Sequence, residues 1–158
     1  MEEQFRAYLG VLRELSGVLD RLTPLALQKA EAARAGDLPA MDEVLKQEQA
    51  LSLNLRGLEL RRQKLASQLG LEGVPLSGLA ERCPAVLADE ARKTAAALRK
   101  SYEIYQSYSN LARSTLELNL HQIDKFLENS GVDPKLAAQG YETPPTEPPQ
   151  KMKTDFRA

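Results

Sequence analysis

The sequence predicts an all-α fold, in which a long antiparallel helical hairpin and a longer third helix form a three-helix bundle or coiled coil, followed by a disordered Pro-rich C-terminal tail. Apolar residues recur at spacings of three and four through three segments, at about residues 3–35, 38–69 and 84–129. Glycines and prolines typical of turns separate these segments. The third segment is about a dozen residues longer than either of the others, so we expect helices of unequal length.

The first helix carries an apolar arc wide enough to contact two neighbouring helices. The arc follows a four-three spacing with a second row beside it: Tyr8, Leu12, Leu15, Leu19 and Leu22, flanked by Val11, Val18 and Leu25. Pro24 interrupts the arc. Because proline has no N–H to donate to the carbonyl of Asp20, a bend or break is expected in the preceding turn.

A tight antiparallel turn is expected between the first two helices. Gly36 is a typical helix stop, and Asp37 is a typical N-cap for the next helix. Pro39 falls in the first turn of that helix, where its missing N–H donor costs nothing.

The second helix has one apolar stripe with two polar interruptions. The stripe runs through Met41, Val44, Leu51, Leu55, Leu58, Leu65 and Leu69, with Leu53 and Leu60 beside it. Glu48 and Arg62 interrupt it. Either these long side chains reach past the seam to pair with charges on neighbouring helices, or they belong to a buried pair that sets the register. After this helix, Ser77 is expected to cap a short turn through Arg82, and Pro84 to open the last helix.

The third helix is expected to extend beyond its partners. At 1.5 Å rise per residue it spans ~65 to 70 Å against ~45 to 50 Å for the other two, which leaves ~20 Å of apolar helix without a partner. It also has two stripes, one with Tyr102 and Tyr105, and another with Ile104, Tyr108, Leu111, Thr115 and Leu118. Two neighbours in a bundle can cover both stripes, or one stripe can receive an external helix. An uncovered apolar overhang favours a binding surface.

Composition narrows the function classes. A formal net charge of -1 argues against a nucleic-acid or anionic-membrane partner, which needs clustered Lys and Arg. The acidic N-terminus is unlike a secretory signal, and no apolar run approaches the ~20 residues of a membrane span, so a cytoplasmic protein is expected. The single cysteine, Cys83, fits a reducing compartment.

The sequence gives no support for an enzyme, and no cofactor, metal or small-molecule substrate is expected. His121 falls opposite the apolar stripe, where it is expected at the surface, and with Glu117 and Lys125 it lacks a third metal ligand. Cys83 has no second histidine in the chain to serve as a base. We expect a helical domain at 1–130 and a flexible Pro-rich tail at 131–158.

The order of these features resembles the FlgN family of flagellar export chaperones. The second helix carries a Leu-Glu-x-x-Arg element, Leu58-Glu59-Leu60-Arg61-Arg62, and the loop carries Leu76-Ser77-Gly78-Leu79. The long third helix contains the pair Asn110-Leu111, and the tail has a lone tyrosine, Tyr141. One departure is that Gly140 precedes this tyrosine, whereas in the family the tail glycines usually follow it.

The resemblance implies a cytoplasmic type III flagellar export chaperone. Such a chaperone binds the C-terminal helices of the hook-filament junction proteins (hook-associated proteins), prevents their premature assembly and delivers them to the membrane protein of the export gate. It implies client contacts at the end of the last helix and an export-gate contact at Tyr141. The expected client residues are Tyr108, Leu111, Leu116, Leu118, Leu120, Ile123, Phe126 and Leu127. The alternative is a structural coiled-coil protein that forms a homodimer through the same helix end.

Overall fold

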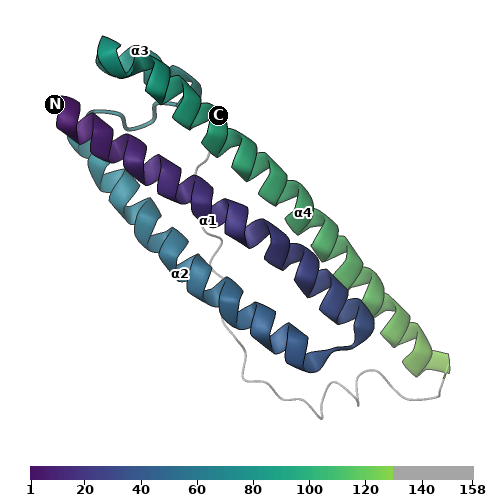
Figure 1. Ribbon diagram of the computed structural model, residues 1–158. Coiled ribbons are helices and arrows are strands. Elements are labelled where there is room, and N and C mark those ends of the chain that lie inside the picture. The colour runs from purple at the N-terminus through teal and green to yellow at the C-terminus, as the bar shows by residue number, and fades with distance from the viewer. Residues whose placement is uncertain (130–158) are drawn as a thin grey trace.

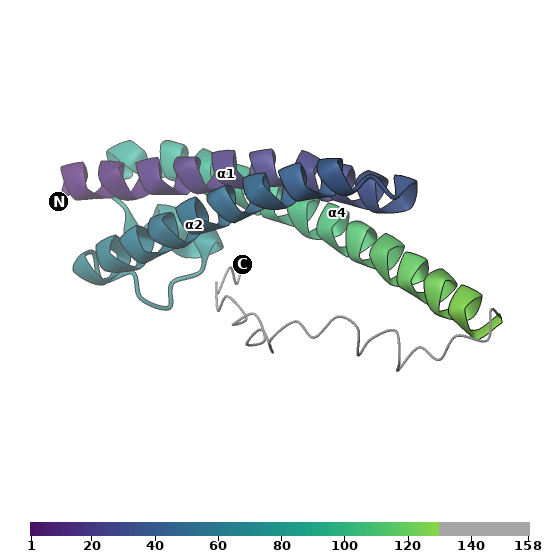
Figure 2. The same ribbon diagram turned by 90° about the horizontal axis from the view of Figure 1, so that it is seen from below.

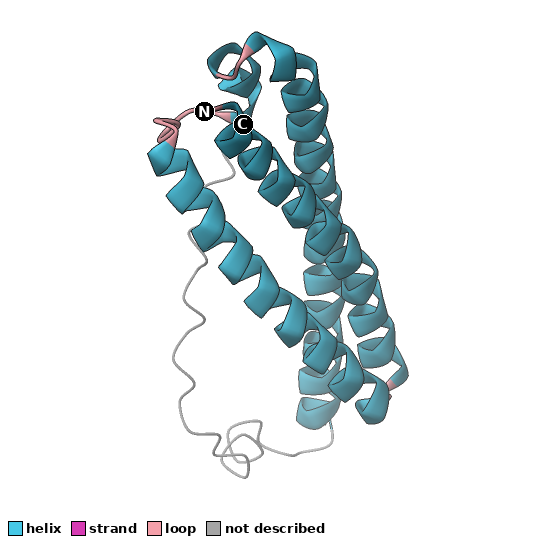
Figure 3. Ribbon diagram, turned by 60° about the vertical axis from the view of Figure 1, so that its left-hand side comes forward, coloured by secondary structure: helices cyan, strands magenta, loops and turns pink. Residues whose placement is uncertain are grey.

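The computed structural model describes residues 1–129 and confirms the all-α fold (Figure 1). The three long helices are α1 (Glu2–Ala35), α2 (Leu38–Gln68) and α4 (Ala88–Asn129). Short helical turns connect the last two: η1 (Leu76–Gly78), α3 (Leu79–Arg82) and η2 (Ala85–Leu87). Within residues 1–129 the structure contains no strand (Figure 3). The predicted tail, with Tyr141, lies outside the described residues, and the division into two domains therefore stays a prediction.

Helix α1 is the central helix and packs on both α2 and α4, which hardly contact one another. Its partner α2 runs antiparallel to it, since Lys29 pairs with Glu48 at one end and Glu14 with Arg61 at the other. Helix α4 runs parallel to α1, and Figure 1 shows α1 between the other two. The helices therefore alternate in direction along the chain, as expected.

The core is built mainly on α1, and the wide apolar arc predicted there is confirmed. Every residue of that arc is buried, and Leu9 extends it: Tyr8, Leu9, Val11, Leu12, Leu15, Val18, Leu19, Leu22 and Leu25. Leu55 of α2 and Leu98 of α4 are buried in the same cluster. Burying one such side chain contributes about 1.5 to 3 kcal/mol, so this cluster is the main source of stability.

The turn between α1 and α2 forms as the sequence predicts. Gly36 adopts a left-handed φ of 66°, and the N–H of Asp37 donates to the carbonyl of Ala32 at 3.0 Å. The Asp37 carboxylate accepts from the N–H of Ala40 at 3.1 Å, which satisfies one of the free donors at the start of α2.

A bend or break was expected before Pro24, and the break does not occur, because α1 is continuous from Glu2 to Ala35. Leu22 and Leu25 on either side of this proline are buried, so packing holds both flanks in the helix. In the same turn, the Thr23 hydroxyl donates to the carbonyl of Leu19 at 3.0 Å.

The connection from α2 to α4 folds over one end of the core, where Leu71, Leu79 and Leu87 are buried. A short helical turn ends at Arg82 as expected, but the Ser77 side chain does not cap it. The reason is positional: Ser77 lies inside η1, and Gly78 takes the N-cap position of α3. Pro84 precedes η2, and α4 itself begins at Ala88.

The two polar interruptions of α2 have different partners. Glu48 pairs across the hairpin with Lys29 of α1 at 2.8 Å, which confirms an interhelical pair. Arg62 does not pair with a charge on another helix. Its partner is Glu59 on α2 itself, one turn earlier, and both side chains are largely buried. The reason is that positions three residues apart face each other on a helix, so Glu59 can reach Arg62 without a second helix.

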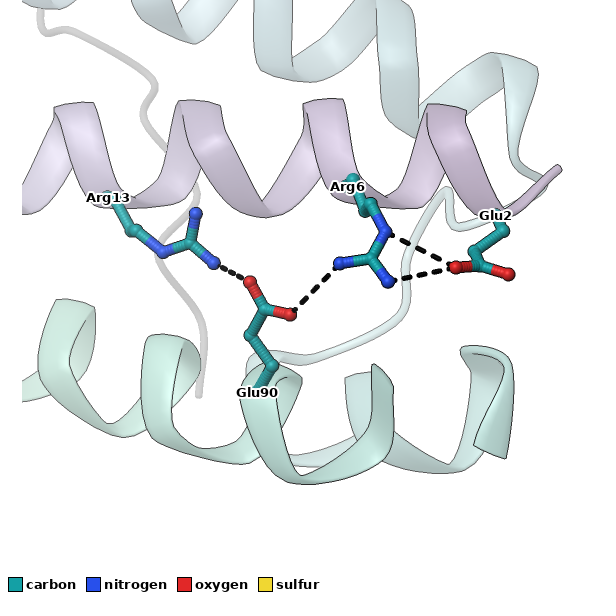
Figure 4. A network of polar contacts seen from close by, with 4 residues as sticks. All are labelled: Glu2, Arg6, Arg13 and Glu90. Carbon is teal, nitrogen blue, oxygen red and sulfur yellow. Dashed lines mark hydrogen bonds and ion pairs between the residues drawn. The ribbon is translucent and has the colours of Figure 1, made fainter. Parts of the chain in front are cut away.

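A network of exposed charges joins the first halves of α1 and α4 (Figure 4). Glu90 of α4 pairs with Arg13 and, at 3.7 Å, with Arg6 of α1, which also pairs with Glu2 at 2.9 Å. Pairs this exposed contribute little stability each, but their directions agree with the parallel register of the two helices.

Candidate functional site

The candidate site is the end of α4 that extends past α1. The last buried packing between the two helices involves Ala112 of α4 with Ala26 and Ala30 of α1. Thr115 lies in a groove with Arg34, close to the end of α1 at Ala35. From there α4 continues to Asn129, a length of ~20 Å at 1.5 Å per residue. We call residues 116–129 the α4 overhang, which projects away from the other helices in Figure 2.

The eight predicted client residues lie along this end of α4. Most of them are exposed in residues 1–129: Tyr108, Leu111, Leu118, Leu120, Ile123 and Phe126. Leu116 and Leu127 are half-buried. The exposed fractions of Leu118 (56%) and Ile123 (54%) contrast with 1% for Leu98, which lies on the same helix where α1 covers it. The overhang therefore presents large apolar side chains in a concentration typical of binding surfaces.

Seven of these eight residues form two neighbouring rows. Leu116, Leu120, Ile123 and Leu127 continue the row that faces α1 earlier in the helix, as the 3.6-residue period requires. Tyr108, Leu111 and Leu118 form a second row, on the side of α4 next to the first. Tyr108 and Leu111 precede the overhang, so they lie beside α1 and not beyond its end.

Sequence reasoning missed the contribution of α1. A groove of about 440 Å³ runs between the end of α1 and α4, and Leu111 lies on its α4 side. Residues of α1 line the other side: Leu27, Gln28, Ala30, Glu31 and Arg34. Leu27 is 41% exposed and lies off the buried stripe of α1, which is the one sequence signal that could have indicated this groove. The groove leads into the overhang and extends the apolar surface onto a second helix.

The charged groups and the histidine of the α4 overhang are solvent-exposed. His121 is exposed, as predicted from its position opposite the apolar row. Among residues 1–129, no group of His, Cys, Asp and Glu could hold a metal ion. Cys83 lies at the other end of the molecule, where its thiol donates to the carbonyl of Ala80 at 3.2 Å.

The most buried ion pair among residues 1–129 lies on α2. Arg62 donates to both Glu59 oxygens, from Nε at 2.8 Å and from Nη2 at 2.7 Å. Hydrogen bonding to Glu59 raises the pKa of Arg62 above its ordinary value against the opposing effect of burial, and the Tyr8 side chain adds to the increase. This fork joins two residues of the Leu-Glu-x-x-Arg element within α2, and the contact of Arg62 with Tyr8 reaches α1.

Across residues 1–129, no helix combines the length and the apolar character that a bilayer crossing requires. The fold and the exposed row together define a helical protein that presents an apolar helix end beyond its own core.

The chain belongs to the FlgN family: the family model described as FlgN protein matches residues 1–142. No curated protein and no solved structure matches the chain. The FlgN family implies a flagellar export chaperone that binds flagellar proteins, and its chaperones are cytoplasmic in general. It is a chaperone family and not known as an enzymatic one.

Proposed function

We propose that this chain is a type III flagellar export chaperone that binds the C-terminal helices of hook-filament junction proteins, keeps them unassembled and delivers them to the export gate. The observation that carries the client-binding step is the apolar row of α4, which continues past the end of α1. Leu120 and Ile123 are more than half exposed on a helix whose earlier turns bury the equivalent row, as at Leu98. An amphipathic client helix would cover this row through its own apolar face.

The groove beside Leu27 supports a client that contacts both helices. A client helix on the overhang that runs back towards Ala112 would meet Leu111 of α4 and Leu27 of α1 on the two sides of the groove. Such a client would bury apolar area on two helices instead of one. Burial of one large apolar side chain contributes about 1.5 to 3 kcal/mol, so contacts on both helices help to offset the cost of association.

The proposal is tested with the full chain and a purified C-terminal fragment of each hook-filament junction protein. Titration calorimetry should give a 1:1 complex, and Ile123→Ser should weaken it by about tenfold or more, because the client loses an apolar contact in exchange for a hydroxyl. Leu45→Ser is the matched control, since Leu45 is also exposed (46%) but lies on α2, which hardly contacts α4. Equal affinity of the two variants would contradict the assignment of the client surface.

The export step is assigned to Tyr141, on the resemblance to the family. We expect Tyr141→Ala to keep client affinity unchanged while it weakens the contact with the export-gate membrane protein. Motility and a gate-binding assay of the same variant separate the two steps. Wild-type motility would remove Tyr141 from the proposal, and loss of client binding would mean that its role is in the earlier step.

The alternative function is self-association through the overhang, as in a structural coiled-coil protein. The same apolar row would then bury itself against a second copy. Mass measurement in solution distinguishes the two: a monomer that becomes a heterocomplex with a client supports the chaperone. A dimer that Ile123→Ser dissociates, and that excludes the client fragments, supports the structural protein.

A further inference from the structure

The outer face of α2 carries a second apolar patch, which is separate from the α4 overhang. Leu53 and Leu60 are 66% and 61% exposed, and they lie on the side of α2 opposite to the buried Leu55. They are seven residues apart, which places them two turns, or ~10 Å, from each other along one face. No helix of the described part covers this face, because α1 packs on the other side of α2.

Gly57 lies between these two leucines on the same face. It is exposed in the interior of a helix, and a Cβ added there would meet nothing within 4 Å among the described residues. Glycine in such a position destabilises a helix relative to alanine, and the packing of residues 1–129 gives no reason for it. Without a Cβ at Gly57, the space between the side chains of Leu53 and Leu60 is open, and we call this open position the depression; a knob from another helix could enter it.

The charge around this depression is positive. Arg56 is adjacent to Gly57, and Lys64 follows Leu60 by one turn. Neither side chain forms an ion pair with any of residues 1–129, whereas Arg61 and Arg62 of the same segment both do. The nearest carboxylate in sequence, Glu59, lies three residues after Arg56, but it is buried and already held by Arg62.

We propose that the patch formed by Leu53, Arg56, Gly57, Leu60 and Lys64 is a docking site for an amphipathic helix of a partner protein with an acidic rim. An apolar side chain of that helix enters the depression over Gly57, and its carboxylates pair with Arg56 and Lys64. A second copy of this chain fits less well, because an antiparallel pair centred on Gly57 brings the two Arg56 side chains together. Since α2 and α4 lie on different sides of α1, this partner and a client on the overhang can bind together.

The test uses the full chain and two synthetic helical peptides of about 20 residues. Both carry leucines seven residues apart; one is flanked by glutamates and the other by lysines. Fluorescence anisotropy should detect binding of the acidic peptide and not of the basic one. Gly57→Ala should lower the affinity of the chain for the acidic peptide by about tenfold, because the new methyl group fills the depression. Leu60→Gln should lower this affinity by a similar factor.

Gly17→Ala is the matched control, because Gly17 is also exposed inside a helix with open space around it. Its neighbours one turn away are charged: Arg13, Glu14, Asp20 and Arg21. Both glycine substitutions should raise the melting temperature by about 2 to 4 °C, which shows that each variant folds. Of the two glycine variants, only Gly57→Ala should bind the acidic peptide more weakly. Ile123→Ser, on the overhang, should bind this peptide as tightly as the unchanged chain.

Three results would overturn the proposal. The first is an acidic peptide that does not bind or that binds Gly57→Ala as well as the unchanged chain. The second is equal binding of the acidic and basic peptides, which would remove the role of Arg56 and Lys64. The third is self-association of the chain that Gly57→Ala abolishes, which would make a second copy the occupant.

Discussion

Arg62 donates two hydrogen bonds, of 2.7 and 2.8 Å, to the carboxylate of Glu59 on the buried side of α2. Glu59 is 7% exposed and also accepts a hydrogen bond from Gln63 at 3.2 Å. The pair thus places a neutralised charge in the seam between α1 and α2, where an unpaired one would be costly.

Replacing only one residue of the Glu59–Arg62 pair should lower the free energy of unfolding far more than replacing both. Arg62→Met should destabilise the chain by about 3 kcal/mol, because the Glu59 carboxylate stays buried without its cation. The double variant Glu59→Leu with Arg62→Met should be closer to the unchanged chain than Arg62→Met alone. Urea unfolding of the two single variants and the double variant gives the coupling energy. Simple additivity of the two single effects would show that the pair is not coupled.

The helix cap at Asp37 is expected to contribute to stability. Asp37→Ala removes the carboxylate that accepts from the N–H of Ala40, so the free energy of unfolding should fall by about 1 kcal/mol. Asp42→Ala is the control: Asp42 is on the exposed face of the same helix, in a surface pair with Lys46. Its effect should stay within about 0.5 kcal/mol. Equal effects in thermal unfolding would argue against the cap.

Core and overhang should respond differently to the same kind of truncation. Leu98→Ala should cost about 2 to 5 kcal/mol, because Leu98 is 1% exposed and packs against α1. Ile123→Ala should cost less than about 1 kcal/mol, because its side chain is 54% exposed. Chemical unfolding of both variants tests this. A large loss for Ile123→Ala would mean that another part of the chain covers the overhang.

The groove between α1 and α4 should contribute to client affinity. Leu27→Glu places a carboxylate on the α1 side of the groove and should lower the affinity for a client fragment by about tenfold. Leu45→Glu, at a similarly exposed position on α2, is the matched control and should leave the affinity unchanged. If Leu27→Glu binds as tightly as the control, the client contacts α4 without α1.

Much of the architecture follows from local patterns. The helix ends at Gly36 and Asp37 depend on backbone conformations and capping groups that those residue types favour, so the sequence predicts the turn directly. The arc on α1 is equally visible, because its apolar residues repeat with the helical period. A break at Pro24 was predicted wrongly, since a local rule cannot weigh the buried Leu22 and Leu25 that keep the helix continuous, whereas a bend there stays a prediction.

The sequence by itself determined the helical period, the cap and the unequal helix lengths, because each of these depends on residues close together in the chain. Only the tertiary structure decided that α1 is central, that α2 and α4 hardly meet, and that Arg62 pairs within its own helix. The same holds for Leu27, which reaches the α4 groove only through the parallel register of α1 and α4. These relationships depend on which faces of distant segments meet, and the periodicity of one helix does not specify its neighbours.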